Sequence, residues 1–95
     1  MSTTEQLQTY CSVDVAAHLA GLSAARVRRL VRSGLVQPRL VEQGRPLFGE
    51  IELIRLRKIR RLTIDLGVNL AGVEVILRLT DELAELRANA PREDQ

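Results

Sequence analysis

The cations of this 95-residue chain gather in its middle, and most of them are arginines. Between positions 26 and 61 stand eleven Arg or Lys residues against three acids, a net charge of +8, whereas residues 1–25 carry −2 and residues 62–95 carry −4. Ten of the eleven cations are arginine, whose planar guanidinium can place two hydrogen bonds on phosphate oxygens. A basic middle between acidic ends predicts a nucleic-acid-binding surface.

The densest group of arginines lies in one short segment. The stretch from position 26 to 32 contains no acid and four arginines: Arg26, Arg28, Arg29 and Arg32. If this segment is a helix that enters the major groove, its first residues reach base edges and its later ones meet phosphates. We therefore predict that Arg26 reads bases, while the other three contact mainly phosphate. The alternative is an ordinary solvated helix face.

Residue types that perform catalysis or hold metal ions are scarce. Cys11 and His18 are the only cysteine and histidine, so one chain can form neither an internal disulfide nor a four-ligand zinc site. We expect Cys11 to be a small, partly buried thiol and His18 a surface residue, with a sensing role as the alternative. Paired carboxylates, a nucleophile with its base and a glycine-rich phosphate loop are also missing. We predict no catalytic site, no metal and no cofactor.

Aromatic residues and long apolar segments are also few. Tyr10 and Phe48 are the only aromatic residues, so stacking of single-stranded bases has little support. No apolar run approaches the roughly 18 residues that span a bilayer, and no secretory leader is visible. Together with the lone cysteine, these features predict a cytoplasmic protein with no membrane partner.

Capping residues predict two short helices that would carry the four arginines. Ser12 and Ser23 are good N-caps for helices over 13–20 and from 24 to about 33, and Gly21 ends the first. A tight turn of this kind is typical of a helix-turn-helix. The pair would be held together by its apolar residues, which are Val15, Ala16, Leu19, Leu22, Val27, Leu30 and Val31.

The next stretch reads as a small hairpin. Pro38 excludes a helix there, and Gln43-Gly44 is a turn signal between two short apolar pairs, 40–41 and 47–48. We predict a two-stranded ribbon with Arg45 exposed at its tip, where it is a further candidate DNA contact.

A long amphipathic helix is predicted from Glu50 to Leu66, where Gly67 ends it. We expect some of its cations to pair with Glu52 or Asp65 at helical spacing, and the others to contact phosphate or solvent. Its apolar face would consist of Ile51, Leu53, Ile54, Leu56, Ile59, Leu62 and Leu66.

A last helix is predicted from its cap at Asn69 to about Ala88, before Pro91. It carries a short coiled-coil seam, less than two heptads long, because four apolar residues are spaced 3, 4 and 3 apart: Ile76, Leu79, Leu83 and Leu86. The seam could be intramolecular core or a dimer contact. We favour a homodimer, because an apolar stripe that continues past a small domain needs a partner.

The predicted fold is mainly all-α: a winged helix-turn-helix with a small two-stranded wing and a C-terminal helix. We divide the chain into a loose segment 1–10, the winged domain 11–67, a dimerisation helix 68–88 and a loose tail 89–95. A homodimer of this fold would place two recognition helices about 34–36 Å apart on a palindromic DNA site.

The predicted helix-turn-helix, wing and long third helix, which extend with the last helix from about Cys11 to Leu86, together resemble the MerR family of bacterial transcription regulators. Arg28 matches a DNA-contacting arginine of that family's recognition helix. The residues RSGLV at 32–36, with Pro38, are similar to its "R-x-G-L-(L/V)-x-P" exit, and FGEIELIRLRKIRRL at 48–62 is similar to its wing end and third helix. The resemblance implies a winged helix-turn-helix that binds double-stranded DNA.

The segment LGVNLAGVEVIL at 66–77 is similar to two subgroups of that family. The heat-shock repressors of the HspR type bind DNA, which implies a regulator linked to heat-shock or chaperone genes. The CbpM-like chaperone modulators instead bind a DnaJ-type co-chaperone. Two departures from the family count against specific operator binding: Pro46 replaces a phosphate-binding arginine of the wing, although Arg45 could substitute, and Arg29-Leu30 replaces paired tyrosines. The departure in the wing favours the second subgroup. The density of arginines on the recognition helix favours the first.

Overall fold

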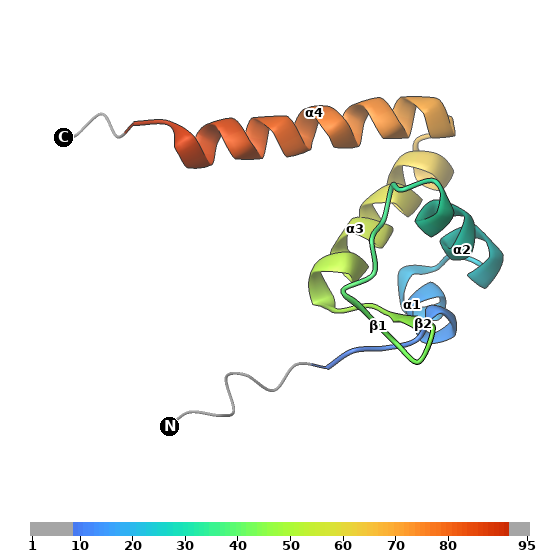
Figure 1. Cartoon of the computed structure of the whole chain (residues 1–95). Coiled ribbons are helices and arrows are strands. Elements are labelled where there is room, and N and C mark those ends of the chain that lie inside the picture. Colours follow the sequence, from blue (N-terminus) through green and yellow to red (C-terminus); the bar gives the residue numbers. More distant parts are fainter. Residues whose placement is uncertain (1–8, 92–95) are drawn as a thin grey trace, which may run out of the picture.

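The computed structural model describes residues 9–91, so most of the predicted loose ends, 1–8 and 92–95, lie outside the described residues. Its elements follow in the order α1 (Val13–Ala20), α2 (Ala24–Arg32), β1 (Leu40–Glu42), β2 (Arg45–Leu47), α3 (Glu50–Arg60), the π turn (Arg61–Asp65) and α4 (Leu70–Asn89). Figure 1 shows α1, α2, α3 and the small ribbon gathered in one body, from which α4 extends. The predicted winged helix-turn-helix is confirmed.

The helix-turn-helix begins and ends at the residues that cap it. The Ser12 hydroxyl accepts a hydrogen bond from the Val15 amide at 3.4 Å, and the Ser23 hydroxyl accepts one from the Arg26 amide at 3.1 Å. Gly21 has a φ of 76°, the left-handed conformation that ends a helix and favours glycine. Polar caps and one glycine therefore fix where α2, the predicted recognition helix, starts.

Helices α1 and α2 pack through small residues. Ala16, Ala17 and Ala20 of α1 are at most 3% exposed and lie in one core with Val27 and Leu30 of α2. Alanines at this spacing form one face of α1 and let α2 approach closely.

Two residues expected in that contact are not in it. Val15 and Leu19 are 47% and 48% exposed, so the prediction that they hold α1 against α2 is wrong. The buried face of α1 runs through Val13 and the alanines, and the two larger residues lie beside it.

The wing is a two-residue hairpin. Gln43 and Gly44 have φ values of 53° and 75°, as the two central residues of a type I′ turn require. The strands pair antiparallel, with Glu42 opposite Arg45 and Val41 opposite Pro46. Hydrogen-bonded and non-hydrogen-bonded pairs alternate from the turn outward, so Pro46 occupies a non-hydrogen-bonded position. Its missing N–H therefore costs the ladder no hydrogen bond to β1.

Phe48 joins the wing to the start of the described chain. Its backbone exchanges two hydrogen bonds with Cys11, at 2.9 and 2.8 Å, and its side chain is fully buried. The ring lies in the common core with Leu56 and Ile59 of α3. One aromatic residue thus connects the N-terminal segment, the wing and α3.

Helix α3 is shorter and less apolar on its buried side than predicted. The single helix expected over 50–66 gives way to the π turn after Arg60. Ile51, Ile54 and Leu66 are 66%, 56% and 64% exposed, so their assignment to the apolar face is wrong. The buried apolar stripe of α3 is narrow, because the buried position in its first turn is occupied by Glu52 and not by an apolar residue.

Glu52 has a structural task of its own. Its carboxylate accepts a hydrogen bond from the Gly49 amide at 2.8 Å, which caps the start of α3. The carboxylate is buried and forms no ion pair among the described residues, so its predicted pairing with a cation of α3 is wrong.

Helix α4 packs apolar residues into the body only along its first half. The Asn69 side chain accepts a hydrogen bond from the Gly72 amide at 2.8 Å, and Val73 and Leu77 are buried in the common core. Every residue from position 81 to 90 is exposed. Among residues 9–91, no helix is both long enough and apolar enough to cross a membrane.

Candidate nucleic-acid interface

Helix α2 buries one narrow side and presents its arginines on the remainder. Val27 and Leu30 are 0% and 1% exposed and Val31 is half-buried, so these residues define the inward side. On a helix with about 3.6 residues per turn, Arg29 and Arg32 then point away from the core. Both are exposed, as the recognition-helix prediction requires.

Arg28 lies on the flank of α2 that faces α1. Its guanidinium is 3.6 Å from the Asp14 carboxylate, and the two side chains are 54% and 78% exposed. An ion pair this exposed adds little stability, but it keeps the Arg28 guanidinium beside the first turn of α1. This contact could not be predicted from helix periodicity, because Asp14 lies on another helix.

Arg26 and Arg29 lie together beside a hollow of about 370 Å³ between α2 and the start of α4. Ile59 and Thr63 line its α3 side and Asn69 its α4 side. Within residues 9–91 neither arginine side chain has an ion pair or a hydrogen bond. Both guanidinium groups are therefore available to an anion.

Arg45 stands apart from the α2 arginines. It is the first residue of β2, directly after the wing turn, and is exposed. In Figure 1, α2 and the wing both lie toward the end of the molecule away from the free end of α4. The predicted DNA contacts thus fall on two elements, with four on the recognition helix and one on the wing.

The cations of α3 and its π turn divide into two groups. Arg55 pairs with Asp81 at 3.2 Å and Arg60 pairs with Asp65 at 3.3 Å. The predicted use of Asp65 as a partner is confirmed, whereas the contact with Asp81 was missed because 26 positions separate the pair. The other three cations are exposed and form no ion pair among the described residues: Arg57, Lys58 and Arg61.

The predicted seam of α4 is on the outer side of that helix. Leu79, Leu83 and Leu86 are 56%, 46% and 69% exposed, and Ile76 is half-buried. The side of α4 that faces the body carries Val73 and Leu77 instead. The alternative that the seam is intramolecular core is therefore wrong for its three leucines.

Cys11 and His18 show no arrangement for chemistry. Cys11 is half-buried, and this burial raises the pKa of its thiol, so that less of the reactive thiolate is present at neutral pH. His18 is exposed on α1. Across residues 9–91, no cluster of three or more His, Cys, Asp or Glu side chains is placed to hold a metal ion.

Comparison with known proteins adds two findings. Residues 11–91 match the family described as MerR HTH family regulatory protein. A Streptomyces coelicolor protein that bears the provisional name heat shock protein HspR is 42% identical over 89 residues. That alignment covers 92% of this chain and 57% of the relative.

Proposed function

Because this chain belongs to the MerR helix-turn-helix family of regulatory proteins, we propose that it regulates transcription by binding double-stranded DNA, as a regulator of the HspR type. It would act as a homodimer on a palindromic site and control heat-shock or chaperone genes. The homodimer would use the exposed seam of α4, and each copy would insert one α2 helix into the major groove.

One observation carries the proposal: α2 exposes four arginines and no acid, while its apolar side is buried. A solvated helix face usually mixes both signs of charge, because opposite charges three or four residues apart stabilise a helix. Here Arg26, Arg29 and Arg32 have no acidic partner among the described residues. The positive charges of such a face repel one another, and binding to a polyanion relieves this repulsion.

The roles of the arginines follow from their positions along α2. Arg26 lies in the first turn of the helix, which reaches base edges in this class of fold. Arg28, Arg29 and Arg32 follow, and Arg45 of the wing would meet the adjacent backbone. Binding through phosphate releases counterions, so affinity should fall with salt at a log–log slope of about −0.9 per phosphate contacted.

Two single substitutions should separate phosphate contact from base reading. Arg28→Ala is expected to weaken binding to all sequences alike and to reduce the salt slope by about 1. Arg26→Ala is expected to cost about 1–3 kcal/mol of discrimination between the selected site and a single-base variant. The measurement is fluorescence anisotropy with DNA selected from the source genome, titrated at several salt concentrations.

Arg78→Ala is the matched control, because it removes the same charge from an exposed position on α4, away from the proposed interface. Its affinity and salt slope should equal those of the unaltered protein. Full affinity and an unchanged slope for Arg28→Ala would refute the role assigned to that residue.

A second candidate function is binding to a DnaJ-type co-chaperone. Two observations favour it: Pro46 stands in the wing where a phosphate-binding arginine was expected, and the leucines of the α4 seam are exposed. Under this alternative, DNA binding would be weak, equal for all sequences and lost at physiological salt. A purified DnaJ-type protein would then bind instead, and Leu83→Glu would abolish that complex.

A further inference from the structure

Two arginines of α3 make contacts that differ from those of the other cations. The Arg55 Nε donates a hydrogen bond to the Leu35 carbonyl at 2.8 Å, just beyond the end of α2. The two terminal nitrogens of the same guanidinium donate to the two oxygens of Asp81, each at 3.2 Å. One side chain thus joins the exit of the recognition helix to α4.

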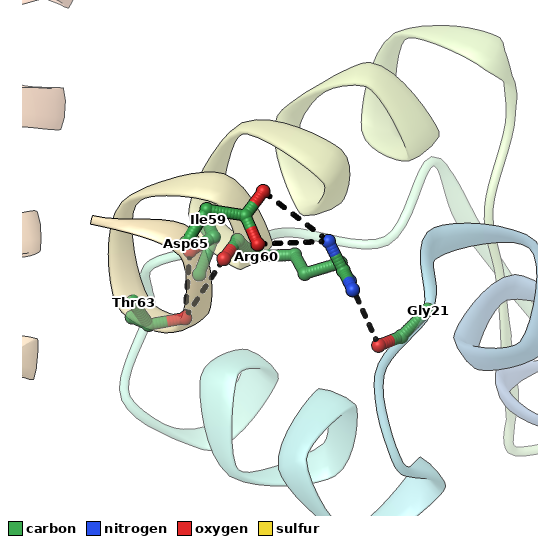
Figure 2. Close-up of polar contacts among 5 residues, drawn as sticks. All are labelled: Gly21, Ile59, Arg60, Thr63 and Asp65. Carbon is green, nitrogen blue, oxygen red and sulfur yellow. Dashed lines mark hydrogen bonds and ion pairs between the residues drawn. The ribbon is translucent and has the colours of Figure 1, made fainter. Parts of the chain in front are cut away.

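Arg60 repeats this arrangement at the other end of α2. Its Nε donates to the Gly21 carbonyl at 3.3 Å, in the turn that precedes α2. One terminal nitrogen donates to both oxygens of Asp65, at 3.3 and 3.4 Å (Figure 2). Gly21 is suited to this contact, because a Cβ there would lie only 2.7 Å from the Arg60 Nε.

The π turn is what brings Asp65 to Arg60. In a regular α-helix, residues five positions apart point about 140° away from each other. Bonding from i to i+5 widens the turn and returns the fifth residue to the same side. The Thr63 hydroxyl supports this turn by donating to the Ile59 carbonyl at 2.8 Å and the Arg60 carbonyl at 3.3 Å (Figure 2).

The contacts of Arg55 and Arg60 are arranged in the same way. Each arginine donates to a backbone carbonyl that flanks α2, and each is ion-paired with an acid that follows it in the chain. Asp81 belongs to α4 itself, and Asp65 ends the π turn that leads into α4. We call Arg55 and Arg60 the strap arginines. Arg55 ties the exit of α2 directly to α4. Arg60 ties the turn before α2 to the end of α3, from which the chain continues into α4.

Stability alone does not account for the straps. The side chains of both ion pairs are between 31% and 59% exposed, and pairs of this exposure contribute little to stability. The geometry is more informative, because a planar guanidinium with several donors fixes the direction of each partner, whereas a lysine does not. The buried contacts of α4 are made by Val73 and Leu77 in its first half, and the Arg55–Asp81 pair is the ion pair that reaches its second half among the described residues.

We propose that Arg55 and Arg60 are positioning residues that hold α2 at a fixed orientation relative to α4. The consequence for DNA rests on the proposed function: in a dimer joined through α4, this orientation sets the distance between the two recognition helices. The straps therefore determine which spacing between DNA half-sites the protein accepts.

The direct test measures the distance between α2 and α4 in the DNA-free protein. Spin labels are attached at Ala25→Cys and Glu85→Cys in a Cys11→Ser background, and labelled chains are diluted with unlabelled ones so that only distances within one chain contribute. Double electron–electron resonance is recorded with the strap arginines intact and in the double variant Arg55→Lys/Arg60→Lys, which keeps the net charge.

The intact straps should give one narrow distance, and the double variant should lose it to a broad or split distribution. The matched control is Arg57→Lys/Arg61→Lys, which changes two exposed cations of the same region and should leave the narrow distance unchanged. An unchanged distribution in the strap variant would overturn the proposal. If that variant does not fold, Asp65→Asn/Asp81→Asn cuts only the exposed acid side of each strap and carries the same expectation.

A second measurement tests the consequence for DNA. Affinity is compared across sites whose half-sites are moved apart or together one base pair at a time, and for a single half-site. The strap variant should lose about tenfold or more of its preference for the best spacing, in the range of typical couplings between sites, with unchanged affinity for one half-site. If no DNA is bound at all, the proposed function fails, while the distance measurement still decides the role of the straps.

Discussion

Replacing Phe48 with alanine should lower the free energy of unfolding by about 3–5 kcal/mol. The ring is fully buried in the common core, so its removal leaves a cavity that the surrounding aliphatic side chains fill only in part. A domain of this size is typically stable by only about 5–10 kcal/mol. The variant should therefore be partly unfolded near body temperature, and the loss should appear as a lower midpoint in urea denaturation followed by circular dichroism.

Two further variants make this test specific. Val41→Ala removes an apolar side chain from the same wing, but Val41 is 61% exposed and its loss should change stability by less than about 0.5 kcal/mol. Phe48→Leu keeps most of the buried volume and should cost less than the alanine variant. Equal losses for Val41→Ala and Phe48→Ala would show that the core is not organised around the ring.

Local signals explain why the helix starts and the wing could be predicted from the sequence. Ser12, Ser23 and Asn69 each accept the capping bond that their side chains suggest. The Gln43-Gly44 turn needs two residues with positive φ, which few other dipeptides supply. Each of these features depends on residues within four positions, so the sequence alone contains the cause.

Long-range contacts explain what could not be predicted. Ile51 and Ile54 fit an amphipathic pattern, yet no described element packs over them, and the wider stripe expected of α3 is exposed there. The π turn places Asp65 beside Arg60, whose Nε also donates to the Gly21 carbonyl 39 positions earlier in the chain. The periodicity of apolar residues predicts neither the exposure of these two isoleucines nor the π turn.

The candidate interface could be predicted from the sequence only where it depends on local helix periodicity. That α2 would expose its arginines followed from helix periodicity, because the apolar residues at 27 and 30 define the buried side. The hydrogen bonds from Arg55 and Arg60 to the Leu35 and Gly21 carbonyls depended on partners 20 and 39 positions away, as the ion pair of Arg55 with Asp81 depended on one 26 positions away. The density of arginines therefore predicted where the basic surface lies, but not which of its arginines are free to bind a ligand.

The double substitution Leu79→Glu/Leu83→Glu should abolish the proposed homodimer and, with it, high affinity for a palindromic site. In a two-fold symmetric seam each change occurs twice, so four carboxylates would be brought into an apolar contact. Burying unpaired charge costs several kcal/mol. We expect the dimer dissociation constant to rise by at least about 100-fold, which corresponds to about 2.7 kcal/mol. Sedimentation equilibrium measures this shift.

The matched control is Ala84→Glu, which adds a carboxylate to the same exposed half of α4 but away from the leucine stripe. It should leave both association and DNA binding unchanged. Affinity for a single half-site should also survive in the leucine variant, because each α2 and its arginines remain intact. If the unaltered protein and the leucine variant have the same mass in solution, the seam is not a dimer contact. The exposed leucines would then have to meet a different protein, as the co-chaperone alternative requires.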